Sequence, residues 1–354
     1  MTQNKPNTFV NVALGIIVLF LLVWVLIVGR TIILPFMVAI FLTFMLEPLV
    51  NLLGKVRCPR SLAVFITLIV SFVVLYLLGL LVYANVEQFV ARFPSYQDRL
   101  ATLLYNTVAS LEHLIGKKLS VDILSNINWL EAFQNMSIAS NVVSGVGTFF
   151  TFFMKMLIVI VFMAYMLAGR PRFKRKVAAA FPEGQSRRIE GMIEAITLKI
   201  QKYLSAKTLV SFVTALIAYI IFWGFGLDFA IFWAFIIFLF NYIPNIGSIL
   251  ASSLPILFSI LQYGAFGTAF WLVIALGLLQ FVMGNIIEPR IMGYSLDLSP
   301  TMVIISLIFW GYIWGVAGML LSVPILATMT IITERVDSLR FISVFLKGKV
   351  QDNA

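Results

Sequence analysis

The chain has 354 residues, of which 61% are hydrophobic and 11% are charged, and its mean hydropathy is +1.03. This composition leaves too little polar surface to cover a soluble globule, so it excludes a soluble globular protein and predicts a polytopic membrane protein. The formal net charge of +10 comes mainly from two basic segments, which is a topology signal, and we expect no nucleic-acid partner.

Residue types that carry metal or nucleophilic chemistry are scarce. The single Cys58 and the single His113 cannot form a disulfide, a structural zinc site or a Cys/His catalytic pair. The sequence contains no glycine-rich phosphate loop and no apparent pair of nucleophile and base. We therefore expect neither enzyme activity, nor a cofactor, nor a metal site.

Six apolar runs are long enough to cross a bilayer as helices. They lie at residues 9–28, 31–53, 61–85, 147–168, 206–226 and 266–288. Residues 54–60 hold three basic residues and no acid, and residues 170–207 hold ten basic residues and three acids. The positive-inside rule places both segments and both chain termini in the cytoplasm, and it places residues 86–146 outside.

Two amphipathic segments lie outside these runs. From Pro94 to Ile115, apolar residues recur at helical spacing, which predicts an external helix that serves as a structural cap or a subunit contact. Between Gln185 and Lys207, a second apolar face is accompanied by basic residues. That pattern is typical of a helix lying on the anionic inner leaflet.

Residues 229–262 carry no charge, yet polar and helix-breaking residues interrupt them at the centre. These are Asn241, Pro244, Asn245, Gly247 and Ser248. A continuous helix of this length would reach roughly 50 Å, beyond the ~30 Å hydrocarbon core. We expect two half-helices that meet inside the membrane, with the break buried in protein or lining a wet cavity. Such broken segments are a sequence signal for a transporter's binding site.

Residues 299–332 repeat this anomaly, with Gly311 and Gly315 near the middle and Pro324 beyond them. A second hairpin is expected, entering from the cytoplasm while the first enters from outside, so that the two are related by inverted topology. One long tilted helix in each place is the alternative.

The run between the two hairpins carries small and polar residues on one face. At ~100° per residue this narrow face holds Gly277, Gln280, Gly284 and Glu288. It predicts close backbone approach and hydrogen bonding, as along a substrate path. Glu288 and Arg290, which follow at the helix end, are either functional or a simple exposed pair.

Glu47 is an ionisable residue inside an apolar run, just before Pro48. Intramembrane carboxylates are functional candidates by default. Because Glu47 lies near the cytoplasmic end of its run, we expect it to snorkel toward water.

Five sequence blocks resemble one family of bacterial inner-membrane proteins. They are PFMVAIFLTFMLEPLV (35–50), CPRSLAV (58–64), NYIPNIGSILA (241–251), GNIIEPRIMG (284–293) and SLIFWGYIWGVAGMLLSVP (306–324). The chain is similar nearly end to end to the autoinducer-2 exporter family. The resemblance implies an inner-membrane homo-oligomer, a pentamer as the best guess, that exports the quorum-sensing signal autoinducer-2 or a similar small polar solute. Family members have also been assigned sodium/proton antiport and other substrates.

Together these signals predict an all-α polytopic membrane protein with about six full transmembrane helices and two oppositely oriented re-entrant helical hairpins. The expected units are an N-terminal transmembrane scaffold (1–85), an extracytoplasmic helical segment (86–146), a transmembrane helix (147–169), a basic cytoplasmic amphipathic segment (170–205), a transport core (206–333) with hairpins 229–262 and 299–332, and a cytoplasmic tail (334–354).

The favoured function is secondary transport of a small polar solute by alternating access. The expected substrate contacts are Asn241, Asn245, Ser248, Gln280 and Asn285. The expected gating or shape-setting residues are Pro244, Gly247, Gly284, Pro289, Gly311 and Gly315, and the candidate coupling residues are Glu47, Glu288, Asp297 and Arg290. The contact residues do not titrate near neutral pH, which suits a hydroxylated cargo. A sodium/proton antiporter and a non-transporting membrane scaffold or regulator are the alternatives.

Overall fold

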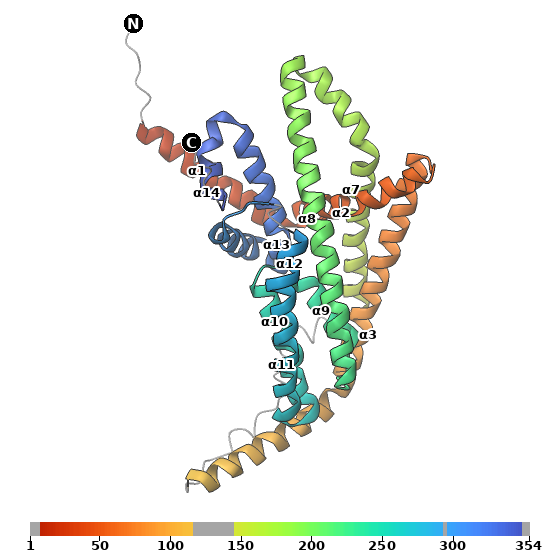
Figure 1. Ribbon diagram of the computed structural model, residues 1–354, viewed down its shortest axis with the longest axis vertical. Helices are drawn as coiled ribbons and strands as arrows, with labels where there is room; N and C mark the ends of the chain where they lie inside the picture. Colours follow the sequence, from red (N-terminus) through yellow and green to blue (C-terminus); the bar gives the residue numbers. More distant parts are fainter. Residues whose placement is uncertain (1–7, 116–144, 293–295, 349–354) are drawn as a thin grey trace.

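The computed structural model describes residues 8–115, 145–292 and 296–348, which form helices almost throughout (Figure 1). In chain order these are α1 (Thr8–Val28), α2 (Arg30–Lys55), α3 (Arg60–Ile115), α7 (Gly145–Ala180), α8 (Glu183–Gly224), α9 (Ala230–Phe240), α10 (Ile246–Tyr263), α11 (Phe266–Val282), the π-helix η1 (Met283–Ile287), α12 (Glu288–Met292), α13 (Pro300–Arg335), the 3₁₀ turn η2 (Asp337–Leu339) and α14 (Arg340–Leu346). One isolated bridge joins Leu298 to Lys347. Residues 116–144 of the expected external segment and residues 349–354 of the expected tail lie outside the described residues.

The length and apolarity of the helices confirm the expected polytopic all-α class. Within the described residues, seven helical segments are long and apolar enough, by length and composition alone, to cross a membrane: Arg30–Lys55, Arg60–Ser110, Thr151–Gly169, Glu183–Gly224, Ile246–Tyr263, Phe266–Ile291 and Pro300–Arg335. The last of these segments is interrupted at Gly315. The apolar stretches Ala13–Val28 and Ala230–Phe240 are shorter. At ~1.5 Å per residue, α9 reaches only about 16 Å, roughly half of the hydrocarbon core.

Two helices continue well past the apolar runs that predicted them. α3 has 56 residues and α8 has 42. In Figure 1, α3 leaves the bundle and passes beneath α11, while α7 and α8 project together from the opposite end. The amphipathic segment from Pro94 to Ile115 is therefore the second half of α3 and not a separate helix.

The interpretation of residues 185–207 as a separate helix on the membrane surface is wrong. These residues form the first half of α8, in line with its apolar half. The apolar face assigned to lipid covers protein, because Ile200, Tyr203 and Leu204 are buried together with Val323 and pack against Phe41. A helix face that packs on protein and one that lies on lipid have the same apolar periodicity, so the sequence could not separate them.

The helix break expected near residue 241 is present. α9 and α10 are separated by a turn in which Tyr242 and Ile243 are buried. Asn245 has a φ of 57°, in the left-handed region, and a Cβ on Gly247 would overlap the carbonyl oxygen of Phe240. Pro244 lacks an N–H, and this close approach requires glycine at position 247, so the local sequence dictates the reversal. We call residues 230–263 hairpin 1 and residues 241–247 its tip.

The second expected break is also present, at Gly315. Its φ of 64° and ψ of −145° are not helical. The hydroxyl of Ser306 donates to the carbonyl oxygen of Ser322 at 3.1 Å, whereas sixteen residues of continuous helix would separate these groups by about 24 Å. α13 is therefore a helical hairpin, which excludes one long tilted helix. We call residues 300–335 hairpin 2 and residues 310–319 its tip.

The two ends of hairpin 2 lie close together. Lys347 forms an ion pair of 2.8 Å with Glu334 near the end of α13. The same Lys347 pairs with Leu298, just before α13 begins. Both ends are thus held by one short segment of the chain.

The outer base of hairpin 1 is tied to the second half of α3. Asp228, just before α9, accepts hydrogen bonds from Arg92 at 3.0 Å and from the hydroxyl of Tyr96 at 2.8 Å. Arg99 donates to the carbonyl oxygen of Gln262, at the end of α10. α3 therefore contacts hairpin 1 where it begins and where it ends.

The two glycines on the small-residue face of α11 do not approach another helix. The side chains that α11 and η1 bury are regularly spaced: Leu272, Leu276, Leu279 and Met283. Gly277 and Gly284 are exposed, and a Cβ added at either would meet nothing within 4 Å. Within one chain, the expected close backbone approach is wrong, because the leucine face drives the packing of this helix.

Candidate functional site

A polar face runs along α8. Its members follow the four-then-three spacing of one helix face: Thr197, Gln201, Leu204, Thr208 and Ser211. Over these fourteen steps the face extends about 21 Å. Leu204 is its one apolar member and is fully buried. We call this set the α8 polar face.

The outer end of the α8 polar face contacts the tip of hairpin 1. The amide of Asn241, only 8% exposed, donates to the hydroxyl oxygen of Ser211 at 3.0 Å. The hydroxyls of Thr208 and Tyr242 share a hydrogen bond of 2.7 Å. The break in hairpin 1 therefore has polar partners in protein, as a break at membrane depth requires.

A buried ion pair lies beside this contact. Lys207 of α8 binds Glu288 at the start of α12, and their side chains are 4% and 25% exposed. Tyr203, one turn earlier on α8, is also buried. The expected pair of Glu288 with Arg290 does not form, because Glu288 turns toward α8 and Arg290 is exposed.

The π-helix η1 immediately precedes Glu288. One π-helical turn carries an extra residue and so rotates everything after it relative to a regular α-helix. The register that placed Gly277, Gln280, Gly284 and Glu288 on one face therefore does not hold as far as Glu288. This rotation accompanies the pairing of Glu288 with Lys207, which the sequence did not reveal.

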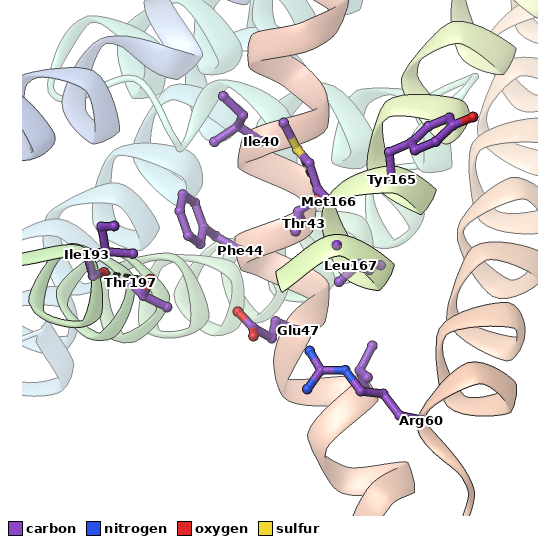
Figure 2. Close-up of a pocket in the computed structure, with 12 residues that line it drawn as sticks. Ile40, Thr43, Phe44, Glu47, Arg60, Tyr165, Met166, Leu167, Ile193 and Thr197 are labelled. Carbon is purple, nitrogen blue, oxygen red and sulfur yellow. Dashed lines mark hydrogen bonds between the residues drawn. The ribbon is translucent and has the colours of Figure 1, made fainter. Parts of the chain in front are cut away.

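A cavity of about 450 Å³ lies at the inner end of the α8 polar face, between α2, α7 and α8 (Figure 2). Its polar lining comprises Thr43, Glu47, Arg60, Tyr165 and Thr197. Its apolar lining includes Ile40, Phe44, Val50, Met166, Leu167 and Ile193. We call it the Glu47 cavity. It lies at the end of the molecule that the charge pattern assigns to the cytoplasm.

Glu47 does not snorkel to the surface. It is 6% exposed, lines the cavity and accepts a hydrogen bond from the side-chain amide of Gln201 on α8. The expectation of snorkelling is wrong because α7 and α8 cover this end of α2. Nothing in the local sequence around Glu47 signals that cover.

A second cavity of about 270 Å³ lies between α2, α8 and hairpin 2. Ile40 and Phe44 line both cavities and so stand between them. Phe41 and Leu204 belong to a buried apolar cluster that also lies between α2 and α8. This cluster separates the Glu47 cavity from the tip of hairpin 1.

The other expected contact residues do not converge on one point. The hydroxyl of Ser248 donates to the carbonyl oxygen of exposed Asn245 at 3.0 Å. Gln280 donates to the hydroxyl of Ser252 at 3.3 Å, and exposed Asn285 donates to its own helix at Phe281. Of the five expected contacts, Asn241 joins the α8 polar face, Asn245 and Ser248 bind each other, and Gln280 and Asn285 lie elsewhere.

The remaining expected residues fall in three places. Pro244 and Gly247 shape the tip of hairpin 1, and Gly311 and Gly315 shape that of hairpin 2, where a Cβ on Gly311 would press on Met319. Gly284 and Pro289 are exposed. Asp297 is exposed, and its carbonyl oxygen accepts a hydrogen bond from Gly348.

In the described residues, no group of three or more His, Cys, Asp or Glu side chains could hold a metal ion.

Comparison with known proteins identifies the class of protein to which this chain belongs. A family model described as the AI-2E family transporter matches residues 14–338. The chain belongs to the AI-2E transporter family. It is therefore a multi-pass membrane transporter and not an enzyme.

Several curated proteins are similar to this AI-2E family chain over most of their length. The AI-2 transport protein TqsA of Escherichia coli is 33% identical over 89% of each chain. A protein of Borreliella burgdorferi, provisionally named a transport protein, is 30% identical over 97% of this chain and 92% of its own. One of Haemophilus influenzae with the same provisional name is 32% identical over 94% of each chain.

Proposed function

We propose that this transporter exports a small polar molecule by alternating access. We propose further that this molecule is the quorum-sensing signal autoinducer-2. Autoinducer-2 is favoured because a relative sharing a third of its residues over nearly the whole length is named for AI-2 transport. Relatives of similar identity carry no named cargo, so the cargo needs a direct assay.

The α8 polar face supports a transport path along this helix. One end of it lines the Glu47 cavity, and the other binds the tip of hairpin 1. The buried apolar cluster around Leu204 lies between them. Such an arrangement offers hydrogen-bonding groups at both ends and a barrier in the middle, as alternating access requires.

The two hairpins support an inverted arrangement in the membrane. We propose that hairpin 1 enters from outside and hairpin 2 from the cytoplasm, and that both tips lie near the midplane. The proposed setting is the bacterial inner membrane, with both chain termini in the cytoplasm. The proposed assembly is a homo-oligomer, with a pentamer favoured by the family resemblance.

The experiment that tests export is autoinducer-2 flux across proteoliposomes that contain the purified chain. Wild type is compared with Asn241→Ala, which removes the amide that binds Ser211, and with Asn285→Ala, an exposed asparagine that bonds only to its own helix. Saturable flux that falls in Asn241→Ala and persists in Asn285→Ala would support the proposal. No saturable flux from folded wild type would reject autoinducer-2 as the cargo.

A sodium/proton antiporter is the second candidate, and the buried pair of Lys207 and Glu288 favours it. Ionisable residues within membrane segments often mark ion pathways. Antiport predicts sodium-driven proton movement in proteoliposomes, read with a pH-sensitive dye, and its loss in Glu288→Gln. Wild type without that movement would exclude antiport and leave export of a polar solute.

A further inference from the structure

The Glu47 cavity contains more polar groups than a structural void needs. Figure 2 shows Glu47 from α2, Arg60 from the start of α3 and Thr197 from α8 around one space, while the ring of Tyr165 from α7 points away from them. At about 450 Å³, the cavity falls within the size range of small-molecule sites. Most of the remaining lining is apolar, which is also typical of such sites.

Three side chains at the cavity donate their hydrogen atoms to groups of the protein itself. The hydroxyl of Thr197 donates to the carbonyl oxygen of Ile193 at 2.8 Å, and that of Thr43 donates to the sulfur of Met166 at 3.8 Å. The side-chain amide of Gln201 donates to Glu47. Hydroxyl oxygens keep acceptor lone pairs, and a carboxylate accepts several hydrogen bonds at once. These groups offer acceptors, and the guanidinium of Arg60 adds N–H donors, so the cavity wall suits a ligand whose groups both donate and accept hydrogen bonds.

The charge of the lining selects among such ligands. Glu47 and Arg60 both line the cavity, and the guanidinium of Arg60 points toward Glu47 in Figure 2. The lining thus contains one acidic and one basic residue, so it has no excess of negative charge with which to attract a cation. A neutral molecule with several hydroxyl groups matches both the acceptors and the charge.

We infer that the Glu47 cavity is a binding site for a neutral, polyhydroxylated small molecule, and that Glu47 and Thr197 determine the affinity of the cavity for this ligand. The inference that this ligand is cargo rests on the proposed export of such a solute. The site receives cargo on the side predicted to be cytoplasmic. Cargo then passes the apolar cluster around Leu204 to reach the tip of hairpin 1. This site lies on α2, α7 and α8, away from the hairpin residues that the sequence nominated.

Transport kinetics test the assignment, with autoinducer-2 as the probe in proteoliposomes. Glu47→Gln and Thr197→Val keep side-chain size and remove the charge or the hydroxyl. Losing one hydrogen bond to a ligand weakens binding roughly 10-fold, so each variant should raise the half-saturation concentration by about that factor and leave the maximal rate nearly unchanged. The matched control is Thr328→Val, the same change in the neighbouring cavity.

Cysteine protection provides a readout that does not require transport. In a Cys58→Ala background, Thr43→Cys is labelled with a small thiosulfonate reagent in the full-length protein, with and without autoinducer-2 or a simple polyol. The cavity site predicts slower labelling with either ligand. It predicts no change for the control Thr301→Cys, an exposed position at the start of α13.

The outcomes separate this site from the proposed function. Absent wild-type flux with clear protection of Thr43→Cys would reject export and keep the binding site. Wild-type flux with unchanged half-saturation in folded Glu47→Gln and Thr197→Val would reject the site and keep export. Protection by a small organic amine but by no polyol would overturn the neutral-ligand assignment.

Discussion

The two hairpins break at similar positions along their segments but are held in different ways. The tip of hairpin 1 is bound to α8 by side-chain hydrogen bonds from Asn241 and Tyr242. The tip of hairpin 2 is held mainly by packing, because Ile313, Trp314 and Leu321 lie against α1 and α2. Its polar contacts include a hydrogen bond of 3.1 Å from the Trp314 indole to the carbonyl oxygen of Leu26.

The difference indicates which contact is suited to change during transport. Hydrogen bonds between a tip and α8 can be exchanged for hydrogen bonds to a polar cargo or to water with little net change in free energy. Apolar packing has no such substitute in a wet cavity. We therefore expect hairpin 1 to be the gate that responds to cargo and hairpin 2 to be the more static partner.

The largest expected effect concerns the ion pair beside hairpin 1. Glu288→Gln leaves the ammonium of Lys207, whose side chain is 4% exposed, without its partner. It should lower the free energy of unfolding by about 3–5 kcal/mol, measured by thermal or denaturant unfolding in detergent. Adding Lys207→Met to that variant should recover most of the loss, because no buried charge then remains. Unchanged stability in the single variant would show that the pair does not hold α12 to α8.

The next effect tests whether both tips need their glycines. A Cβ on Gly247 or Gly318 would overlap a backbone carbonyl oxygen, that of Phe240 or Trp310. Gly247→Ala and Gly318→Ala should each cost roughly 2–4 kcal/mol of unfolding free energy, seen as lower melting temperatures. Gly277→Ala is the control, since that position faces open space, and it should be neutral or up to ~1 kcal/mol stabilising. Equal unfolding free energies for all three variants would contradict the close backbone approach at the two tips.

A smaller effect separates the two hairpins directly. Ser211→Ala leaves the amide of Asn241 without its partner on α8 and should cost about 1–2 kcal/mol of stability while changing autoinducer-2 flux. Ser306→Ala removes a hydrogen bond internal to hairpin 2 at similar cost and should leave flux unchanged. If both variants alter flux equally, the assignment of hairpin 1 as the gate and hairpin 2 as the static partner is wrong.

The smallest effect concerns the outer base of hairpin 1. Tyr96→Phe removes only the hydroxyl that donates to Asp228, and Arg92 remains to bind that carboxylate. The expected loss is about 1 kcal/mol in unfolding free energy, with autoinducer-2 flux retained. A complete loss of flux in folded Tyr96→Phe would assign gating to the base of the hairpin.

Local features of the fold could be predicted from the sequence because local chemistry determines them. Pro244, Gly247 and Gly315 specify their breaks through missing donors, close approach or a positive φ. Long-range pairs could not be predicted in this way. Lys207 was counted as a loop charge, and its partner lies 81 residues away along the chain.

The Glu47 cavity could not be predicted for the same reason. It requires α2, α7 and α8 to meet, and Gln201 reaches Glu47 across 154 residues. The spacing of Thr197, Gln201, Thr208 and Ser211 is the available signal, but these residues are divided between the predicted surface helix (185–207) and the apolar run 206–226. The π-helix before Glu288 also has no simple sequence signature, so the expected face of α11 was extended one turn too far.

The central claim, that the tip of hairpin 1 must move relative to α8 during transport, is tested most directly by locking that contact. Ser211→Cys and Asn241→Cys are combined in a Cys58→Ser background, joined with a short bifunctional thiol reagent, and assayed for autoinducer-2 flux in proteoliposomes. The uncross-linked double variant lacks both hydrogen-bonding side chains and is the reference. We predict that cross-linking abolishes the flux that this variant retains, and that cleaving the linker with a reductant returns flux to the level of the reference. Unchanged flux from fully cross-linked protein would contradict the claim.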